Sequence, residues 1–287
     1  MNKNITENTK IDFHVHITPP DIAANWKKYT EKEPYFSLLS NSKNNKFACA
    51  EDVIAEMEKE KIDYSVVFGF AFRDIGLCRY VNDYVIEKTR QFPDKLIGFA
   101  VTAPGNEAAK EIERCYKSGL KGTGELFPKG QGFDLEDSKY ISEITEVCKE
   151  YDIPLLLHFN EPVGHYYPGK TETSLKQIET FVTNNPEIKI VLAHFGGGLL
   201  FYETMKEIKE KFRNVYYDTA ASVFIYNSGI YIAVKALGLC GKLLFGSDFP
   251  LITPSRYYND IEDAGFSDEE KKLFMGINAQ KILGLYK

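Results

Sequence analysis

Residues 10–16 read Lys-Ile-Asp-Phe-His-Val-His, and the interpretation of the whole chain starts from this stretch. Apolar and polar residues alternate along it, which predicts a β-strand whose polar face carries Asp12, His14 and His16. The Ile-Thr-Pro-Pro sequence at 17–20 cannot continue a central strand, because proline has no backbone N–H to donate. The two imidazoles therefore leave the carboxyl end of the strand on the same side, where they can share one metal ion.

The composition is that of an ordinary globular protein. Of 287 residues, 44% are hydrophobic and 26% are charged, which argues against a disordered or fibrous chain. No run approaches the roughly 18 apolar residues of a membrane span. The polar start at 1–6 lacks an apolar signal stretch, so we expect a cytoplasmic protein. A net charge of −6 gives no electrostatic attraction for nucleic acid.

The five cysteines are odd in number and widely spaced, and no Cys-x-x-Cys occurs. We expect them to be reduced thiols in a cytosolic protein, most of them buried fillers of the core rather than nucleophiles.

Amphipathic helical patterns alternate with short apolar runs along the whole chain. The pattern predicts eight strands, at 10–16, 64–70, 96–101, 120–126, 154–159, 188–194, 215–218 and 242–246. It predicts helices between and after them, at 50–61, 80–91, 107–117, 138–151, 175–183, 199–211, 230–236 and 277–285, the last capped by Asn278 or a neighbour.

Eight such units in this length predict a single α/β domain over 1–287, a (β/α)8 TIM barrel with its active site at the carboxyl ends of the strands. The alternative, an open doubly wound sheet, would need a glycine-rich phosphate loop after the first strand, and none is present. The long stretch 17–49 is interpreted as a lid or inserted cover, or as a surface excursion with a small aromatic core of its own.

Four further predicted strands end in side chains that can bind a metal, namely Glu125, His158, His194 and Asp248. Taken singly, each has an ordinary explanation: a buried core histidine, a cap of a helix or turn, or an acid paired with a lysine. Taken together with the pair in the first strand, they place four of the five histidines of the chain at one rim of the barrel. The coincidence favours a metal site there.

These motifs resemble the amidohydrolase superfamily. The resemblance lies in His14-Val15-His16, in His158, in His-Phe-Gly-Gly-Gly at 194–198, in Gly-Ser-Asp-Phe-Pro at 246–250 and in Asn-Ala-Gln-Lys-Ile-Leu at 278–283. It covers nearly the whole chain. It is most similar to the amidohydrolase-related branch that includes the aminocarboxymuconate semialdehyde decarboxylase-like proteins.

The resemblance implies a divalent metal, usually zinc, held by His14, His16, His158 and Asp248. It implies that His194 is either a base beside a single ion or a ligand to a second one. Zinc accepts imidazole and carboxylate ligands and lowers the pKa of a coordinated water to about neutral. Asp248 would then take a proton from that water and deliver it to a leaving group.

Glu125 departs from many relatives in this branch, which carry a lysine or an uncharged residue at the fourth strand. Its Gly-Glu context is similar to the TatD-like deoxyribonuclease and phosphotriesterase-like arrangements, in which a carboxylate bridges two metals. If Glu125 points inward, two ions are expected, with His158 and His194 on the second. If Glu125 only pairs with Lys121 or Lys129, one ion is expected.

Two other residues are candidates for contact with substrate. Arg73 follows the second strand, and a guanidinium binds carboxylates in a forked geometry; a surface salt bridge is the alternative. His165 lies in the polar and aromatic loop 160–170 after the fifth strand, where it either contacts substrate or is simply solvated.

The sequence thus predicts a metal-dependent hydrolase of a small carbonyl compound, an amide, lactone or ester. The alternatives are a metal-dependent decarboxylase of a small unsaturated or aromatic acid, a two-metal phosphoesterase of the TatD-like type, and a binding protein without metal. The expected partner is a small molecule rather than nucleic acid or membrane, and a homo-oligomer is left open. The substrate is not fixed by the fold.

Overall fold

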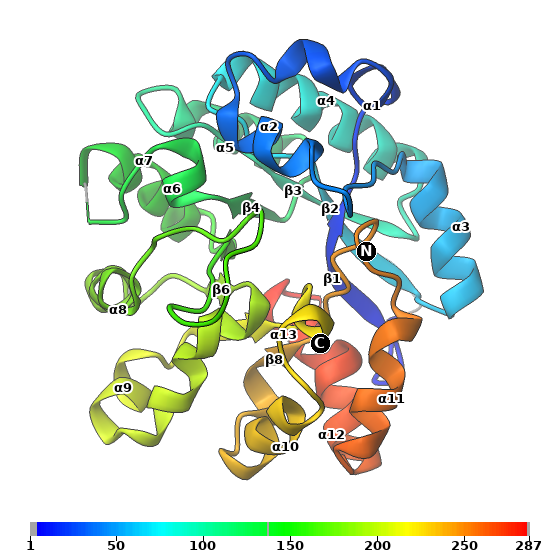
Figure 1. Cartoon of the computed structure of the whole chain (residues 1–287), viewed down its shortest axis with the longest axis vertical. Helices are drawn as coiled ribbons and strands as arrows, with labels where there is room; N and C mark the ends of the chain where they lie inside the picture. The colour runs from blue at the N-terminus through cyan, green and yellow to red at the C-terminus, as the bar shows by residue number, and fades with distance from the viewer. Residues whose placement is uncertain (1–4, 137, 286–287) are drawn as a thin grey trace.

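The computed structural model describes residues 5–136 and 138–285, and its centre is one parallel sheet with the strand order β1 to β8 (Figure 1). The strands are β1 (Ile11–His16), β2 (Tyr64–Phe68), β3 (Leu96–Ala100), β4 (Gly122–Leu126), β5 (Leu155–Leu157), β6 (Ile190–Leu192), β7 (Val215–Asp218) and β8 (Leu243–Leu244).

Hydrogen bonds between the two ends of this sheet bring it round into a barrel. Phe13 N donates to Phe245 O at 2.7 Å, and Asp248 N donates to His14 O at 2.9 Å. Both bonds join β1 to the segment that directly follows β8. The predicted (β/α)8 TIM-barrel fold is confirmed.

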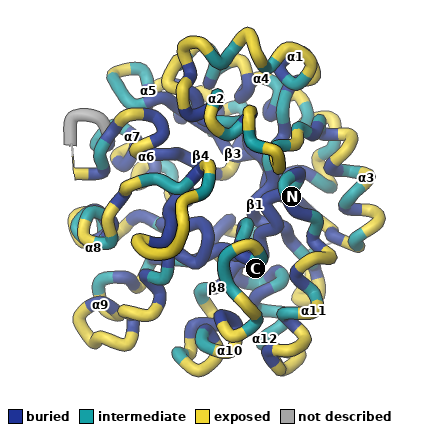
Figure 2. Tube along the Cα trace, viewed as in Figure 1, coloured by how far each residue is buried: buried dark blue, intermediate teal, exposed yellow. Residues whose placement is uncertain are grey.

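Helices surround the barrel, and most of them bury one face against it, so that buried strands lie inside and exposed helix surfaces outside (Figure 2). These helices are α3 (Ala50–Glu60), α4 (Ile75–Gln91), α5 (Ala108–Lys117), α7 (Ser138–Glu150), α8 (Leu175–Asn184), α9 (Lys206–Lys211), α10 (Gly229–Ala236), α11 (Ser255–Asp263), α12 (Asp268–Lys272) and α13 (Asn278–Ile282). Within the two described ranges, no helix is long and apolar enough to cross a membrane.

Two predicted helices differ from the structure. Residues 194–204 form an irregular 3-10 segment instead of the start of a helix, and only α9 is helical there, because the backbone at 195–198 has left-handed φ angles. Asn278 is not a helix cap. It lies inside a continuous helical path after the π-helical turn Leu273–Ile277, and its Nδ2 donates to Cys240 O and Leu243 O beneath β8.

Residues 17–49 contain α1 (Pro20–Ala24), a 3-10 turn (Trp26–Tyr29) and α2 (Pro34–Ser40). The buried carboxylate of Glu33, just before α2, accepts hydrogen bonds from the backbone N–H groups of Arg73 and Asp74, both at 2.8 Å. This pair of bonds ties the excursion to the loop that follows β2. Because α2 is held there, Tyr35 and Phe36 pack over the end of the barrel.

A β-bulge interrupts the alternation of β1. The register with β2 shifts between Asp12 and Val15, where β1 places two residues against one of its neighbour. Asp12 lies with Val15 in a small crevice beside α3, and its Oδ1 accepts from the backbone N–H groups of His14 and Ser247 at 3.2 and 2.9 Å. The prediction that Asp12 shares a face with His14 and His16 is wrong, although the two histidines do come together.

A second bulge shapes β4, where the register shifts between Thr123 and Leu126. Gly124 has a φ of +117°, and a Cβ added to it would lie 2.2 Å from Leu156 O. Only glycine fits both the angle and the close approach. The bulge places Glu125 inside the barrel, where its carboxylate meets histidine side chains from other strands.

We predict that Gly124→Ala destabilises the protein by about 2 kcal/mol or more, because it adds backbone strain and a clash with Leu156 O. Urea unfolding measures the difference. Gly241→Ala is the matched control, since nothing lies within 4 Å of the added Cβ and no left-handed φ is involved. Equal stability of Gly124→Ala and wild type would contradict this explanation of the bulge.

Candidate metal centre

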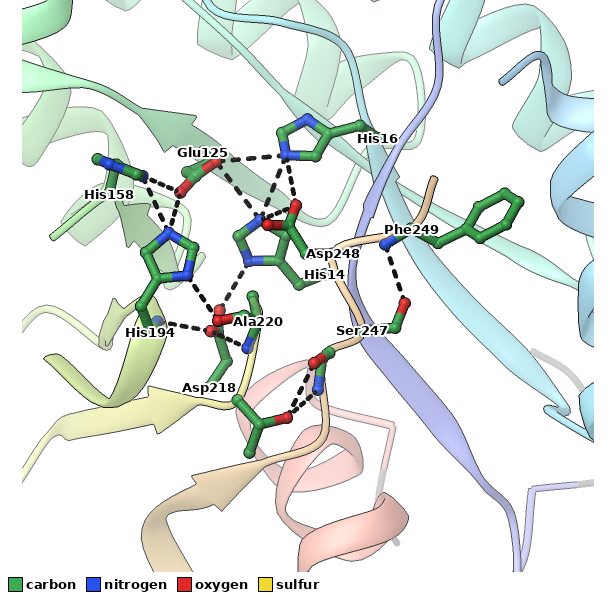
Figure 3. Close-up of polar contacts among 12 residues, drawn as sticks. His14, His16, Glu125, His158, His194, Asp218, Ala220, Ser247, Asp248 and Phe249 are labelled. Carbon is green, nitrogen blue, oxygen red and sulfur yellow. Dashed lines mark hydrogen bonds and ion pairs between the residues drawn. The ribbon is translucent and has the colours of Figure 1, made fainter. Parts of the chain in front are cut away.

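Three side chains from the two joined ends of the sheet form one cluster. His14 Nε2 lies 3.3 Å from His16 Nε2, and Asp248 Oδ1 lies 3.6 and 3.3 Å from these two nitrogens (Figure 3). The two histidines come from β1, and Asp248 comes from the segment after β8. The bonds that close the barrel therefore also assemble this cluster.

Three further side chains form a second cluster at the ends of β4, β5 and β6. Glu125 Oε1 lies 2.9 Å from His158 Nδ1 and 3.5 Å from His194 Nε2, and the two histidine nitrogens are 3.0 Å apart. All three side chains are buried. Each presents one nitrogen or oxygen to the same point (Figure 3).

Glu125 joins the two clusters. Its Oε1 faces His158 and His194, while its Oε2 lies 3.4 Å from the Nε2 atoms of both His14 and His16 (Figure 3). It therefore points inward, and it does not pair with Lys129, which binds Asp134 instead. Of the two arrangements that the sequence left open, the structure has the one in which a carboxylate lies between two sets of histidines.

The charged side chains of the two clusters strongly shift one another's pKa values. Burial lowers the pKa of His14, but the carboxylates of Asp218 and Glu125 outweigh it and raise this pKa well above the usual value. Burial likewise lowers the pKa of His194, and Glu125 raises it to about 9. Burial raises the pKa of Glu125, yet His14 and His158 hold it well below the usual range. The site thus favours ionised carboxylates with positive charge between them.

Three imidazoles are held in orientation by hydrogen bonds from the ring nitrogen that faces away from the cluster. Asp218 Oδ2 accepts from His14 Nδ1 at 2.8 Å, and Ala220 O accepts from His194 Nδ1 at 2.7 Å. His158 Nε2 donates to Gly169 O at 2.9 Å. In each ring the nitrogen opposite the donor faces the cluster and can bind a metal ion once it has released its proton, which is the arrangement a metal ligand needs.

The glycine run after β6 allows the chain to turn beside His194. His194 and Phe195 have φ angles of +57° and +54°, and residues 196–198 continue in the left-handed region. A Cβ on Gly197 would lie 2.2 Å from Asn160 O, so this turn packs directly on the loop after β5. Non-glycine residues in the left-handed region are found preferentially at functional sites, as His194 is here.

The donor set fits a divalent metal. Four imidazole nitrogens and two carboxylates converge, and buried imidazole and carboxylate groups are common ligands of zinc, manganese and iron. Ligands about 2.1 Å from a tetrahedral ion lie about 3.4 Å apart, close to the 3.3–3.6 Å between donors in the first cluster. The two clusters therefore constitute a divalent-metal site.

A cavity of about 520 Å³ opens onto this site. Its floor includes His16, Glu125, His158, His194 and Asp248, and its walls come from 17–49, from the ends of β2 and β4, from the loop after β5 and from the segments after β7 and β8. The cavity is thus formed at the carboxyl ends of the strands, where the sequence places the active site.

Of the two predicted substrate contacts, only one lines the cavity. Arg73 does not line the cavity: its side chain is exposed, and its Nε donates to Gly130 O at 3.2 Å. His165 does line the cavity, at the exposed mouth, with its ring edge against Tyr167.

Two residues of the site were not singled out from the sequence. Asp218 ends the seventh predicted strand, so its position alone was a usable signal. Tyr35 lies in the aromatic excursion 17–49 that the sequence suggests as a lid, but no local pattern distinguishes it from the other aromatic residues there. Its hydroxyl donates to Gly169 O at 2.8 Å and lies 3.4 Å from His158 Nε2, so it covers one edge of the second cluster.

The fold and the metal-binding clusters define a metal-dependent enzyme built on a TIM barrel. The sequence matches the family model described as amidohydrolase over residues 11–285, and the chain belongs to that family. The resemblance stated from the motifs is thereby confirmed.

Solved structures with this fold include two decarboxylases. One is 5-carboxyvanillate decarboxylase from Novosphingobium aromaticivorans, complexed with manganese and 4-hydroxy-3-methoxy-5-nitrobenzoic acid. Its TM-score is 0.75 at 16% identity, and the match covers 98% of this chain and all of that one. The other is dihydroxybenzoic acid decarboxylase from Polaromonas sp. JS666, with bound manganese and 2-nitroresorcinol, with a TM-score of 0.73, 19% identity and 98% coverage of both chains.

A hydrolase is also similar. The probable 2-pyrone-4,6-dicarboxylic acid hydrolase from Acinetobacter baumannii, with citric acid bound, has a TM-score of 0.65 and 16% identity, and the match covers 96% of this chain and 99% of that one. At these identities the three likenesses establish the fold.

We predict that Asp218→Asn weakens metal binding by about 10- to 100-fold, because the amide no longer holds His14 with its Nε2 unprotonated toward the site. Titration with Mn²⁺ and Zn²⁺ against a competing chelator measures this change. Asp134→Asn, on the outer surface beside Lys129, is the control and should bind as wild type does. Unchanged affinity in Asp218→Asn would show that His14 is oriented by other contacts.

Proposed function

We propose that this protein is a metal-dependent decarboxylase of a small aromatic acid. The sequence alone favours hydrolysis of a small carbonyl compound over decarboxylation, and we reverse that order. One observation carries the proposal: the cavity above the metal cluster is lined by aromatic rings. The similar decarboxylases, which are complexed with aromatic ligands, support it.

The aromatic wall is continuous. Phe70 stacks on Phe127 with ring centroids 5.1 Å apart, and Tyr35 packs against both rings. Phe36 packs against Phe70 at 5.0 Å. Flat apolar walls of this kind favour a planar ring and exclude water from it. An aliphatic amide or ester has no need of such a surface.

Decarboxylation requires little of the protein beyond placement and one proton. The bond between the ring carbon and the carboxylate carbon breaks, its electron pair stays on the ring carbon, and carbon dioxide leaves. A proton must then reach that carbon.

Asp248 is our candidate for the proton carrier. It borders the cavity, and its Oδ1 faces His14 and His16, so a proton held by its carboxyl group can be delivered to a ring carbon above the cluster. His194 is the second candidate, since its Nε2 faces the cavity while Ala220 O accepts from its Nδ1.

The metal would be held by His14, His16 and Asp248 and by Glu125, His158 and His194. When bound, a divalent ion supplies positive charge that orients the acid and stabilises negative charge on its oxygens. We propose two ions, because each oxygen of Glu125 faces a different pair of histidines. The metal is manganese or zinc on the chemistry of the donors, and the similar decarboxylases contain manganese.

We predict that wild-type protein binds two equivalents of divalent metal per chain and that Glu125→Gln binds one or fewer, since the neutral amide cannot serve both clusters. Inductively coupled plasma mass spectrometry on protein purified without chelator gives the count. Glu172→Gln, an exposed position in the loop after β5, should keep two equivalents. A single equivalent in both wild type and Glu125→Gln would exclude the bridging role.

We predict that the metal-loaded protein releases carbon dioxide from one or more members of a panel of hydroxybenzoates, and that Asp248→Asn lowers the rate by about 10²- to 10⁴-fold through loss of the proton carrier. A coupled assay for carbon dioxide and chromatography of the arene product measure the reaction. The metal content of Asp248→Asn is determined in parallel, so that loss of metal is distinguished from loss of the proton. No carbon dioxide from any aromatic acid would exclude the proposed function.

Hydrolysis of a lactone, amide or ester remains the second candidate, and the inward-pointing Glu125 favours it, because two-metal sites of this kind activate water. The similar 2-pyrone-4,6-dicarboxylic acid hydrolase supports the same class. Assay of the same preparation with pyrone lactones and aryl esters, followed by release of acid, separates the two reactions.

A further inference from the structure

Glu161 is a buried carboxylate on the cavity wall that the metal cluster does not use. It lies three residues after His158 and is only 7% exposed. Its Oε2 accepts a hydrogen bond from Tyr167 Oη at 2.9 Å. Its Oε1 is buried and has no hydrogen-bond partner among the residues that the structure describes. A buried carboxylate oxygen without a partner is costly and therefore calls for an explanation.

The position of Glu161 is fixed by its neighbours. Asn160 Oδ1 accepts from Thr171 N at 2.8 Å, and Asn160 Nδ2 donates to Tyr167 Oη at 3.1 Å, which aims the tyrosine hydroxyl at Glu161. The loop of residues 160–171 is closed on itself by these bonds. The carboxylate is consequently presented by a rigid support, as binding groups usually are.

No cation in the described part of the chain neutralises this carboxylate. Lys170 is the nearest basic residue of the loop, but its Nζ points to the backbone oxygens of residues 163–165 and to the ring of Tyr167. The other basic residue on the cavity wall, Lys46, donates to Leu251 O. No arginine lines the cavity in the described ranges.

Tyrosine side chains flank the carboxylate. Tyr167 donates to it, and Tyr226 lies so close that burial, the Glu161 charge and a direct contact between the two side chains raise the pKa of Tyr226, although this contact falls outside hydrogen-bond geometry. Tyr226 Oη is itself buried without a hydrogen-bond partner among the described residues. A carboxylate with aromatic rings around it is a favourable environment for an ammonium group, which gains both an ion pair and cation–π contacts.

We infer that Glu161 and its flanking tyrosines bind a protonated amine of the substrate, so that the ligand of this cavity carries an ammonium group as well as its acid. The inference rests on the proposed function only for the acid end of the ligand, which the metal cluster would take. The ammonium supplies the positive charge that the chain does not place beside Glu161. Glu161 would therefore select among acids of similar shape, without taking part in bond breaking.

Three matched probes test this selection, namely 3-(aminomethyl)benzoate, 3-(hydroxymethyl)benzoate and 3-ethylbenzoate, each with its 4-substituted isomer. They have the same ring and acid and nearly the same size, and they differ in whether they end in a cation, a neutral donor or a methyl group. Binding to the full chain loaded with Mn²⁺ is measured by isothermal titration calorimetry at pH 7. We expect an aminomethyl probe to bind about 10- to 100-fold more tightly than its ethyl counterpart, the range of a charged hydrogen bond.

Glu161→Gln should reduce this preference to less than about threefold, because the amide keeps the shape and removes the charge. Glu172→Gln, which alters an exposed carboxylate in the same region, should retain the full preference. Thermal unfolding of both variants checks that each is folded. The comparison of probes on wild type is decisive even if Glu161→Gln does not fold.

The inference is overturned if the aminomethyl and ethyl probes bind wild type equally, if none of the probes binds, if the hydroxymethyl probe binds as tightly as the aminomethyl one, or if the preference persists in Glu161→Gln. These results are independent of turnover. An ammonium preference without any release of carbon dioxide would support the amine site at Glu161 and reject the decarboxylase function. Release of carbon dioxide without the preference would support the decarboxylase function and reject the amine site.

Discussion

The carboxylate of Glu125, held among four imidazoles, is the interaction on which the rest of the site depends. Each of its oxygens faces two histidine nitrogens at 2.9–3.5 Å. A buried carboxylate in this position is tolerated only because positive charge surrounds it, from protonated histidines or from metal ions. It is the side chain through which the two halves of the barrel rim, β1 with β8 and β4 to β6, form one centre.

The backbone has irregular conformations at several points where these side chains are brought together. Bulges in β1 and β4 interrupt the regular alternation just where His14 and Glu125 leave their strands. His194 and Asp248 occupy left-handed conformations at φ of +57° and +64°. Asp218 supports both sides of the centre, since its Oδ2 holds the His14 ring and its Oδ1 accepts from His194 N. Such local strain is compatible with stability because the barrel around it is densely buried.

Above this centre the cavity combines two chemically different surfaces. The aromatic wall formed by the excursion 17–49 and the ends of β2 and β4 suits a planar ring. The loop after β5 adds the carboxylate of Glu161 with its tyrosines. A metal centre, an apolar wall and a separate charged group together can orient a small ligand at three points, which is how a common fold obtains a particular specificity.

The sequence by itself determined the repeating βα pattern, the barrel and most of the residues at its rim, because periodicity and strand ends are local properties. It did not determine that Asp12 turns away, that 194–204 is irregular, or that Arg73 points to Gly130 O, since these depend on bulges and on contacts with distant backbone. The inward direction of Glu125 and the cover that Tyr35 provides were likewise decided only by tertiary structure. Such contacts join residues more than 100 positions apart, as between Tyr35 and Gly169, and no local pattern encodes them.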